Sequence, residues 1–289
     1  MSRRIVILLA LVVAVIGFSG CSRNGSSSKV IQIKGSDTMV MLGQSWTQAF
    51  MERNAGVQCA VTGGGSGTGI AALINGTTNI AEASREMEPE ELAQAKKAGR
   101  NPKEFVVALD ALTVVVNPKN PVGKLTMDQL AGIYTGKITN WSELGGKDQV
   151  IVVLSREKNS GTHVYFLEHV LRGGHAKGPE QFDPRVQMLI SSKAVSDEII
   201  NNQFAIGYFG LGWLNPQKHK AITVAKTDAG PYVSPSVGTA KSGTYPISRK
   251  LYLYTDGEPT GNVKAFIDFA MGVEGQKIVA QQGFVPIRK

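Results

Sequence analysis

The sequence predicts an α/β fold, and two observations support that prediction. β-branched runs alternate with amphipathic helix patterns along nearly the whole chain. Hydrophobic residues make up 42% of the 289 residues, which is enough for a packed core and too many for a disordered chain. The length of the chain is enough for one large domain or two domains of ordinary size, and no internal repeat of fixed period appears.

Residues 1–20 are predicted to be a signal peptide rather than part of the fold. Arg3 and Arg4 precede an apolar run over 5–16 that is too short to span a membrane. Small residues then lead to Cys21, an arrangement that resembles a bacterial lipobox. We therefore expect Cys21 to be lipidated and residues 21–28, which are polar and rich in Gly and Ser, to be a flexible tether. An ordinary signal peptide with a chance cysteine is the alternative.

The charge of the chain favours small anions over nucleic acid as partners. The formal net charge is +8, and removal of the signal peptide takes away Arg3 and Arg4, which leaves +6. Lys and Arg are scattered, without a basic run interleaved with aromatic residues, and export also argues against nucleic acid.

If Cys21 is lipidated, Cys59 is the one remaining thiol. We expect Cys59 to be a small buried hydrophobe.

In the first part of the chain, each β-branched run is followed by a helix pattern. Trp46 and Phe50 share one face of a predicted helix, and Ile70 and Leu73 share one face of the next. A third helix has acidic residues in its first turn, where they suit the helix dipole. We expect strands over 30–34, 57–62 and 79–84, and helices over 40–53, from about 70 to 76, and from about 89 to 99.

The middle and end of the chain continue the alternation. A long apolar run over 105–117 predicts a buried strand, and Asp110 inside it must be either satisfied or functional. Residues 227–248 are rich in Gly, Pro, Ser and Thr and should be mostly loop. Further strands are expected over 150–155, 205–209 and 250–254, and helical segments over 126–134, 141–144, 162–171, 195–202, 262–271 and 274–282.

Three short segments share one pattern, in which a strand ends, a loop of Gly, Ser and Thr follows, and a helix begins. They are GSDTM at 35–39, GGGSGTG at 63–69 and SGT at 160–162. A helix N-terminus carries partial positive charge and free N–H groups, so each loop favours an anion. Arg156 adds a fork-shaped guanidinium that suits a tetrahedral oxyanion, and Arg85 ends a further strand. Together they predict one oxyanion site.

Two enzymatic or cofactor-binding alternatives fit the sequence less well. The glycine loop offers only a loose GxGxxA pattern and lacks the GK[ST] ending of a nucleotide-binding loop. A Ser–His hydrolase would use Ser66 or Ser160 with one of the nearby histidines, but the chain has no GxSxG elbow. His163, His169 and His175 are spaced six apart and do not share a helical face, so we expect no zinc site. We also expect no cofactor and no catalytic residue.

These segments closely resemble the PstS family, the phosphate-binding proteins of the phosphate-specific ABC transporter. GSDTM, GGGSGTG, ASRE, the R-x-x-x-SGT stretch, IYTGKITNW and AIGY occur in the family's order. The resemblance implies a two-lobed periplasmic-binding-protein fold of type II. It places one α/β lobe at 29–112 plus 250–289, the other at 113–249, hinge crossings near 111–115 and 247–253, and the ligand in the cleft.

By position in the motifs, the resemblance also assigns binding residues. Met39 would contribute its backbone N–H. Some members carry an Asp that accepts the phosphate proton where this chain has Arg85, so another acceptor is needed. Asp110 is our first choice and Asp37 the second, although a satisfied structural role for Asp110 remains open. The expected phosphate-binding residues are Ser36, Thr38, Met39, Ser66, Arg85, Asp110, Arg156, Ser160, Gly161 and Thr162.

The resemblance therefore predicts a receptor rather than an enzyme. We expect a monomeric, lipid-anchored protein outside the cytoplasm that captures inorganic phosphate and delivers it to an ABC permease with its ATPase. Closure of the hinge would enclose the ligand and mark the form that the permease distinguishes. A receptor for another oxyanion, such as sulfate or molybdate, is the leading alternative, and a phosphohydrolase that uses the same loops comes next.

Overall fold

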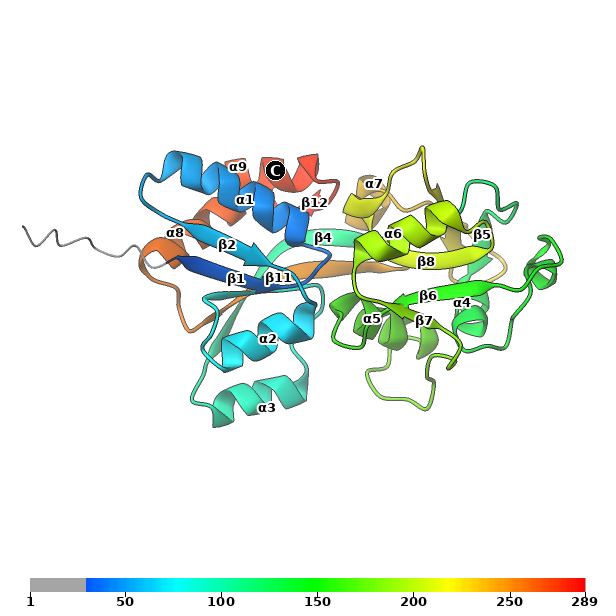
Figure 1. The fold of residues 1–289 in the computed structure, drawn as a ribbon, viewed down its shortest axis with the longest axis horizontal. Coiled ribbons are helices and arrows are strands. Elements are labelled where there is room, and N and C mark those ends of the chain that lie inside the picture. Colours follow the sequence, from blue (N-terminus) through cyan, green and yellow to red (C-terminus); the bar gives the residue numbers. More distant parts are fainter. Residues whose placement is uncertain (1–29, 289) are drawn as a thin grey trace, which may run out of the picture.

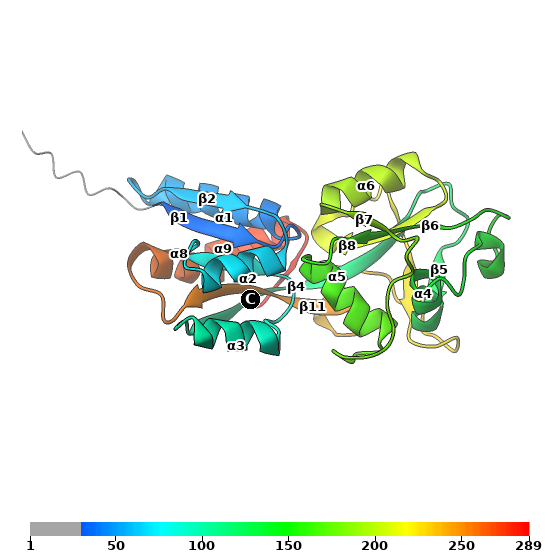
Figure 2. The same cartoon turned by 60° about the horizontal axis from the view of Figure 1, so that its bottom comes forward.

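The computed structural model describes residues 30–288, which fold into two lobes connected by the long strands β4 (Pro102–Val116) and β11 (Ser248–Asp256) (Figures 1 and 2). The predicted signal peptide, the lipidation site Cys21 and the tether lie outside the described residues. Within those residues, no helix combines the length and the apolar character needed to cross a membrane.

The first lobe is built on three parallel strands, in which β1 lies between β2 and β3. Parallel pairing places the carboxyl ends of all three strands at the same edge, which faces the second lobe (Figure 1). Helices cover both faces of this sheet (Figure 1). The elements of this lobe are β1 (Ile31–Gly35), α1 (Val40–Arg53), β2 (Cys59–Thr62), α2 (Ser66–Ile74), β3 (Ile80–Ala83), α3 (Pro89–Lys97), α8 (Gly261–Met271), α9 (Val273–Gln281) and β12 (Val285–Pro286).

Local sequence explains where the helices of the first lobe begin and how they pack. The buried residues Leu42, Trp46 and Phe50 are spaced four apart, so α1 turns one apolar stripe to the sheet. α3 begins at Pro89 after Glu88, which forms a capping box with Glu91, and both features favour a helix start there. The sequence predicts the bounds of α1 and the start of α3 correctly.

The second lobe repeats the arrangement with β6 parallel to β7 and β8. Its core includes Tyr134, Phe166 and Tyr208, and the rings of the last two stack with centroids 3.9 Å apart. The elements of this lobe are β5 (Lys124–Thr126), α4 (Met127–Tyr134), η1 (Trp141–Leu144), β6 (Val152–Arg156), α5 (Gly161–Phe166), η2 (Leu167–Leu171), β7 (Gln187–Leu189), α6 (Ser192–Asn201), β8 (Ala205–Gly210), η3 (Leu211–Trp213), β9 (Lys220–Ala221), β10 (Thr223–Ala225) and α7 (Val237–Lys241).

Several predicted segments differ in their bounds from the structure, among them α2, which begins at Ser66 rather than near residue 70, and two segments differ in kind. The helix expected over 162–171 is α-helical only through α5 and continues as the π-helical turn η2, where the Arg172 N–H donates to Leu167 O. The expected loop over 227–248 contains the short helix α7. Ser236 stabilises the start of this helix, because its side chain accepts a hydrogen bond of 3.0 Å from the Thr239 N–H. Strands of two or three residues, such as β5 and β7, are too short to leave a periodic pattern.

The strand β4 takes part in both lobes. Its first part pairs with β11 and its last five residues pair with β8, both antiparallel. Within residues 30–288, the main sheet therefore runs β2-β1-β3-β11-β4-β8-β6-β7 from one lobe into the other. In this register Asp110 of β4 lies directly opposite Arg249 of β11. The two charged residues thus meet where the chain passes between the lobes.

Candidate functional site

The three Gly/Ser/Thr loops meet between the lobes, at the carboxyl ends of β1, β2 and β6. This crevice is where open α/β sheets bind ligands. Thr38 of the first lobe and Thr162 of the second are 124 residues apart in sequence, yet their hydroxyl oxygens lie 2.9 Å apart. Both residues are almost fully buried. The structure thus brings the predicted site residues of the two lobes into direct contact.

Ser66 and Gly161 form a second contact between the lobes. Ser66 Oγ accepts a hydrogen bond of 3.0 Å from the Ser84 N–H and lies 3.4 Å from Ser84 Oγ. A side chain at position 161 would collide with Ser66 Oγ and would lie 2.8 Å from Ser84 Oγ. Glycine at this position therefore allows the start of α5 to approach the start of α2. The sequence did not single out Ser84 as a site residue.

Free backbone donors gather at these loops. Within residues 30–288, the N–H groups of Thr38, Ser66 and Gly161 donate no hydrogen bond. The Met39 N–H, which was expected to bind the ligand, instead donates to Ser36 O at 3.0 Å. Ser160 Oγ accepts from the Thr162 N–H at 3.2 Å and caps α5. Because unpaired N–H groups at buried helix starts are costly, this arrangement favours an anion that would accept from them.

Arg156 is buried next to the loops. Its guanidinium donates to Ser192 Oγ at 2.9 Å and to Ile190 O at 3.1 Å, and its Nη1 lies 3.3 Å from Asp37 Oδ2. Asp37 belongs to the loop after β1 and also accepts from the Ser192 N–H at 2.7 Å, so it joins the two lobes. Burial lowers the pKa of Arg156, and the charge of Asp37 acts in the opposite direction. Asp37, the second choice of proton acceptor, is thus engaged through Oδ2.

The charged group of Arg85 is paired within its own lobe, and its Nη2 would lie 3.7 Å from a Cβ atom placed on Gly67 of the glycine loop. Its guanidinium makes two hydrogen bonds of 2.7 Å with the Glu91 carboxylate, and Glu88 lies 3.4 Å away. Burial on its own would lower the pKa of Arg85, but the hydrogen bonds and charge of Glu91 raise it overall. Arg85 follows β3 as predicted and turns toward α3. Its role in ligand binding stays a prediction.

Asp110 is fully buried and engaged on both oxygens. Oδ2 accepts from Arg249 Nε at 3.0 Å and from Arg249 Nη2 at 2.9 Å, while Oδ1 accepts from the Leu211 N–H at 2.9 Å. The sequence does not distinguish a satisfied Asp110 from a functional one, and in the structure Asp110 is satisfied by Arg249, which the sequence did not suggest. Arg249 follows a loop-rich segment and carries no motif, so only the register of β4 with β11 reveals the pair.

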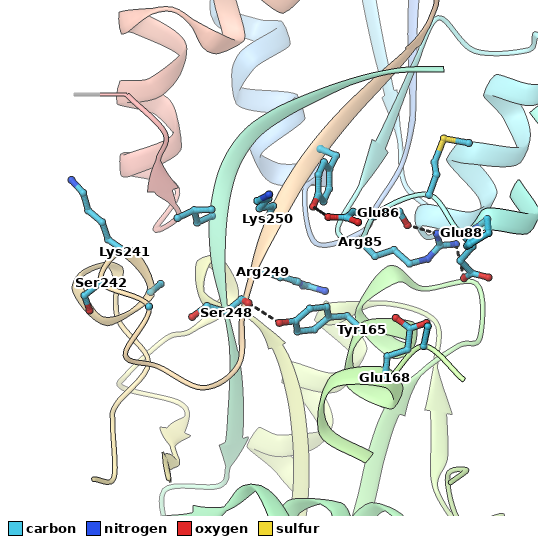
Figure 3. Close-up of a pocket in the computed structure, with 17 residues that line it drawn as sticks. Arg85, Glu86, Glu88, Tyr165, Glu168, Lys241, Ser242, Ser248, Arg249 and Lys250 are labelled. Carbon is cyan, nitrogen blue, oxygen red and sulfur yellow. Dashed lines mark hydrogen bonds and ion pairs between the residues drawn. The ribbon is translucent and has the colours of Figure 1, made fainter. Parts of the chain in front are cut away.

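A cavity of about 680 Å³ lies beside the loops, between the lobes and next to the hinge (Figure 3). Arg85 and Glu88 line it from the first lobe, Tyr165 and Glu168 from the second, and Arg249 from β11. The hydroxyl residues of the three loops do not line this cavity, because they are buried where the lobes touch. Within residues 30–288, no group of three or more acidic, His or Cys side chains is placed to hold a metal ion.

Comparison with known proteins connects this geometry to a family. The model of the PBP superfamily domain matches residues 22–274. The chain is 32% identical to the phosphate-binding protein PstS of Bacillus subtilis strain 168, over 96% of this chain and 90% of that protein. It is 30% identical to the phosphate-binding protein PstS of Pseudomonas aeruginosa strain PAO1, over 93% of this chain and 84% of that protein.

Similar solved structures are also phosphate-transport proteins. A candidate phosphate ABC transporter substrate-binding protein of Clostridium perfringens, solved with bound phosphate, superposes with a TM-score of 0.80 at 32% identity, and the match covers 90% of this chain and 100% of that one. An ABC-type phosphate transport receptor of Vibrio cholerae superposes with a TM-score of 0.69 at 30% identity, over 88% of this chain and 99% of that one. The two-lobed fold expected from the sequence is confirmed.

Proposed function

Because this chain belongs to the PBP superfamily and, within it, to the PstS family of phosphate-binding proteins, we propose that it captures inorganic phosphate and delivers it to an ABC permease for import. The observation that carries the proposal is the meeting of three loops from two lobes, with free N–H groups at Thr38, Ser66 and Gly161. Donors of this kind bind a tetrahedral oxyanion without any change in its covalent structure.

We assign the anion to the space between the two lobes. Thr38 and Ser66 would bind it from the first lobe, and Arg156 would supply charge from the second. Because the donors come from both lobes, the anion would stabilise the closed form over the open one. The direct ligands in this proposal are Ser36, Thr38, Met39, Ser66, Arg156, Ser160, Gly161 and Thr162. Met39 would have to release Ser36 O to donate its N–H.

The proposal extends to the organisation and location of the chain. The first lobe would comprise 29–112 plus 250–289 and the second 113–249, because Trp46 and Phe266 belong to one core cluster while Tyr134 and Tyr208 belong to another. We further propose an extracytoplasmic monomer held at the membrane by a lipid on Cys21, and a protein that does no chemistry on its ligand. Mass spectrometry of the mature N-terminus would test the anchor.

Titration calorimetry tests the proposed function. The protein is first unfolded in denaturant, dialysed free of phosphate and refolded, and then titrated with phosphate, sulfate and molybdate at pH 7.5. We expect phosphate binding that is at least about a hundredfold tighter than sulfate binding. Phosphate keeps a proton at this pH that a carboxylate beside the loops, of which Asp37 is the candidate, would accept, whereas sulfate carries no proton to donate. Equal affinities would overturn the selectivity, and turnover of phosphate esters would favour an enzyme.

A further inference from the structure

Arg249 is a buried cation next to the loop that follows β1. Its side chain is 1% exposed, and its Nη2 lies 3.4 Å from Thr38 Oγ1 in addition to its contacts with Asp110. Nη1 is buried and has no hydrogen-bond partner within residues 30–288. An unpaired charged donor in a closed interior is costly, so this nitrogen points to a partner that would accept from it.

The guanidinium is held firmly in this place. Its carbon lies 5.7 Å from the centre of the Tyr165 ring, and Tyr165 itself donates a hydrogen bond of 2.6 Å to Ser248 O. Figure 3 shows Arg249 extending from its strand toward Tyr165. With Asp110 on one edge and an aromatic ring nearby, the guanidinium has little freedom to turn away from Thr38.

Arg249 and Arg156 approach the same loop from two sides. Arg156 contacts Asp37 and Arg249 contacts Thr38, which are adjacent in the sequence. Burial lowers the pKa of Arg156, and the positive charge of Arg249 lowers it further. Two buried cations that repel one another are stabilised when an anion lies between them. An anion held by Thr38 would lie within reach of both.

We propose that Arg249 is a second arginine of the phosphate site, binding the anion through Nη1, and that Asp110 is the residue that positions it. This inference rests on the proposed phosphate function and deepens it. It also gives Asp110 a different role from the proton acceptor expected from the sequence, since both of its oxygens are occupied in holding Arg249 and the Leu211 N–H.

Calorimetry on the phosphate-free protein tests the role of Arg249. Arg249→Met should weaken phosphate binding at least about tenfold, as expected for loss of a charge-assisted hydrogen bond. The control is Arg100→Met, which removes a more exposed Arg–Asp pair, with Asp256 at the far end of β11 and away from the three loops. The control should leave affinity unchanged. Equal affinity of Arg249→Met and wild type would overturn the inference.

The pH dependence separates ligand binding from a merely structural role. Phosphate loses its second proton, and so changes from a monoanion to a dianion, at about pH 7. With Arg249 in the site, wild-type affinity should rise from pH 6 to pH 8, and the rise should be smaller in Arg249→Met because less positive charge faces the dianion. If the ratio of the affinity at pH 8 to the affinity at pH 6 is the same in wild type and in Arg249→Met, then Arg249 acts only on the fold. That result would overturn the inference.

A double-mutant cycle tests the positioning role of Asp110. Asp110→Asn should weaken phosphate binding in the wild-type background but not in the Arg249→Met background, because there is then no guanidinium to hold. A further loss in that background would mean that Asp110 contacts the ligand itself. If Arg249→Met does not fold, Arg249→Met/Asp110→Leu removes both charges at once and carries the same expectation.

The calorimetric results distinguish failure of the proposed function from failure of the role of Arg249. A wild-type protein that binds no phosphate would overturn the proposed function together with this inference. A wild-type protein that binds phosphate, with an Arg249→Met variant that binds it equally well, would overturn the inference alone.

Discussion

The side-chain amide of Asn159, in the second lobe, donates a hydrogen bond of 2.9 Å to the carbonyl of Gly64, in the first. The main chain reinforces this contact, since the Gly67 N–H donates to Asn159 O at 2.9 Å. Gly65 has a φ of +95°, and a Cβ atom there would lie 2.7 Å from the carbonyl oxygen of Asn159. The glycine loop is therefore shaped by contact between the lobes as well as by its place at a helix N-terminus.

This contact predicts that Asn159 helps to keep the lobes closed. Asn159→Ala would remove the side-chain bonds to Gly64 and Thr68. We expect the loss of about 0.5–1.5 kcal/mol from these exposed bonds, which corresponds to roughly two- to tenfold weaker phosphate binding with faster dissociation. Stopped-flow dissociation measurements would check this. Asn201→Ala, which removes an exposed bond within one lobe, is the control, and equal dissociation rates for both variants would contradict the prediction.

Gly161 should be needed for closure itself. In Gly161→Ala the new methyl group would meet Ser66 Oγ and Ser84 Oγ, so the lobes would be held apart. We expect phosphate affinity to fall by about a hundredfold or more, because the donors of the two lobes would no longer converge. Gly238→Ala is the control, since the nearest atom to its added Cβ would be 3.8 Å away. Small-angle scattering with saturating phosphate would show an open form for Gly161→Ala alone.

Arg85 should contribute to stability more than to binding. Arg85→Met would leave the Glu91 carboxylate with the Glu88 N–H as a donor but without its cation, at a cost of about 1–3 kcal/mol in the free energy of unfolding. Phosphate affinity should change by less than about threefold. The double variant Arg85→Met/Glu91→Gln should recover part of the stability. Loss of affinity by tenfold or more would restore the role assigned to Arg85 from the sequence.

Glu82 should make the protein less stable as the pH rises. It is buried on β3 against Gly43, neither of its carboxylate oxygens has a hydrogen-bond partner within residues 30–288, and burial raises its pKa from 4.5 to about 8. Between these values the unfolded chain has released the proton and the folded protein keeps it. The free energy of unfolding should therefore fall by up to about 1.4 kcal/mol per pH unit from this group.

Urea unfolding at pH 5, 6, 7 and 8 would measure that slope. Glu82→Gln removes the titrating group, so its stability should depend less on pH across the window, while Glu274→Gln, at an exposed carboxyl, should keep the wild-type slope. If Glu82→Gln and wild type show parallel slopes, the carboxyl is ionised in the folded protein and has a partner that compensates its charge.

Much of the fold could be predicted because its signals are local. The spacing of Trp46 and Phe50 predicts α1, and the run that contains Asp110 predicts β4. Short segments such as β5 escaped prediction, since three residues are too few to show a period. The hydroxyl residues of the site could also be predicted from the sequence, because a small polar residue at a strand end before a helix is a local pattern.

The local patterns of the sequence predict the kind of site: α/β strands whose ends are followed by hydroxyl-rich helix starts, which favour an oxyanion. The tertiary structure alone decided which charges meet. Arg85 turns to Glu91, Asp110 binds Arg249 across 139 residues, and Asn159 closes on the glycine loop. The reason is physical. Helix and strand formation depends on neighbours a few residues apart, whereas the partner of a buried charge depends on strand register and on how two lobes pack.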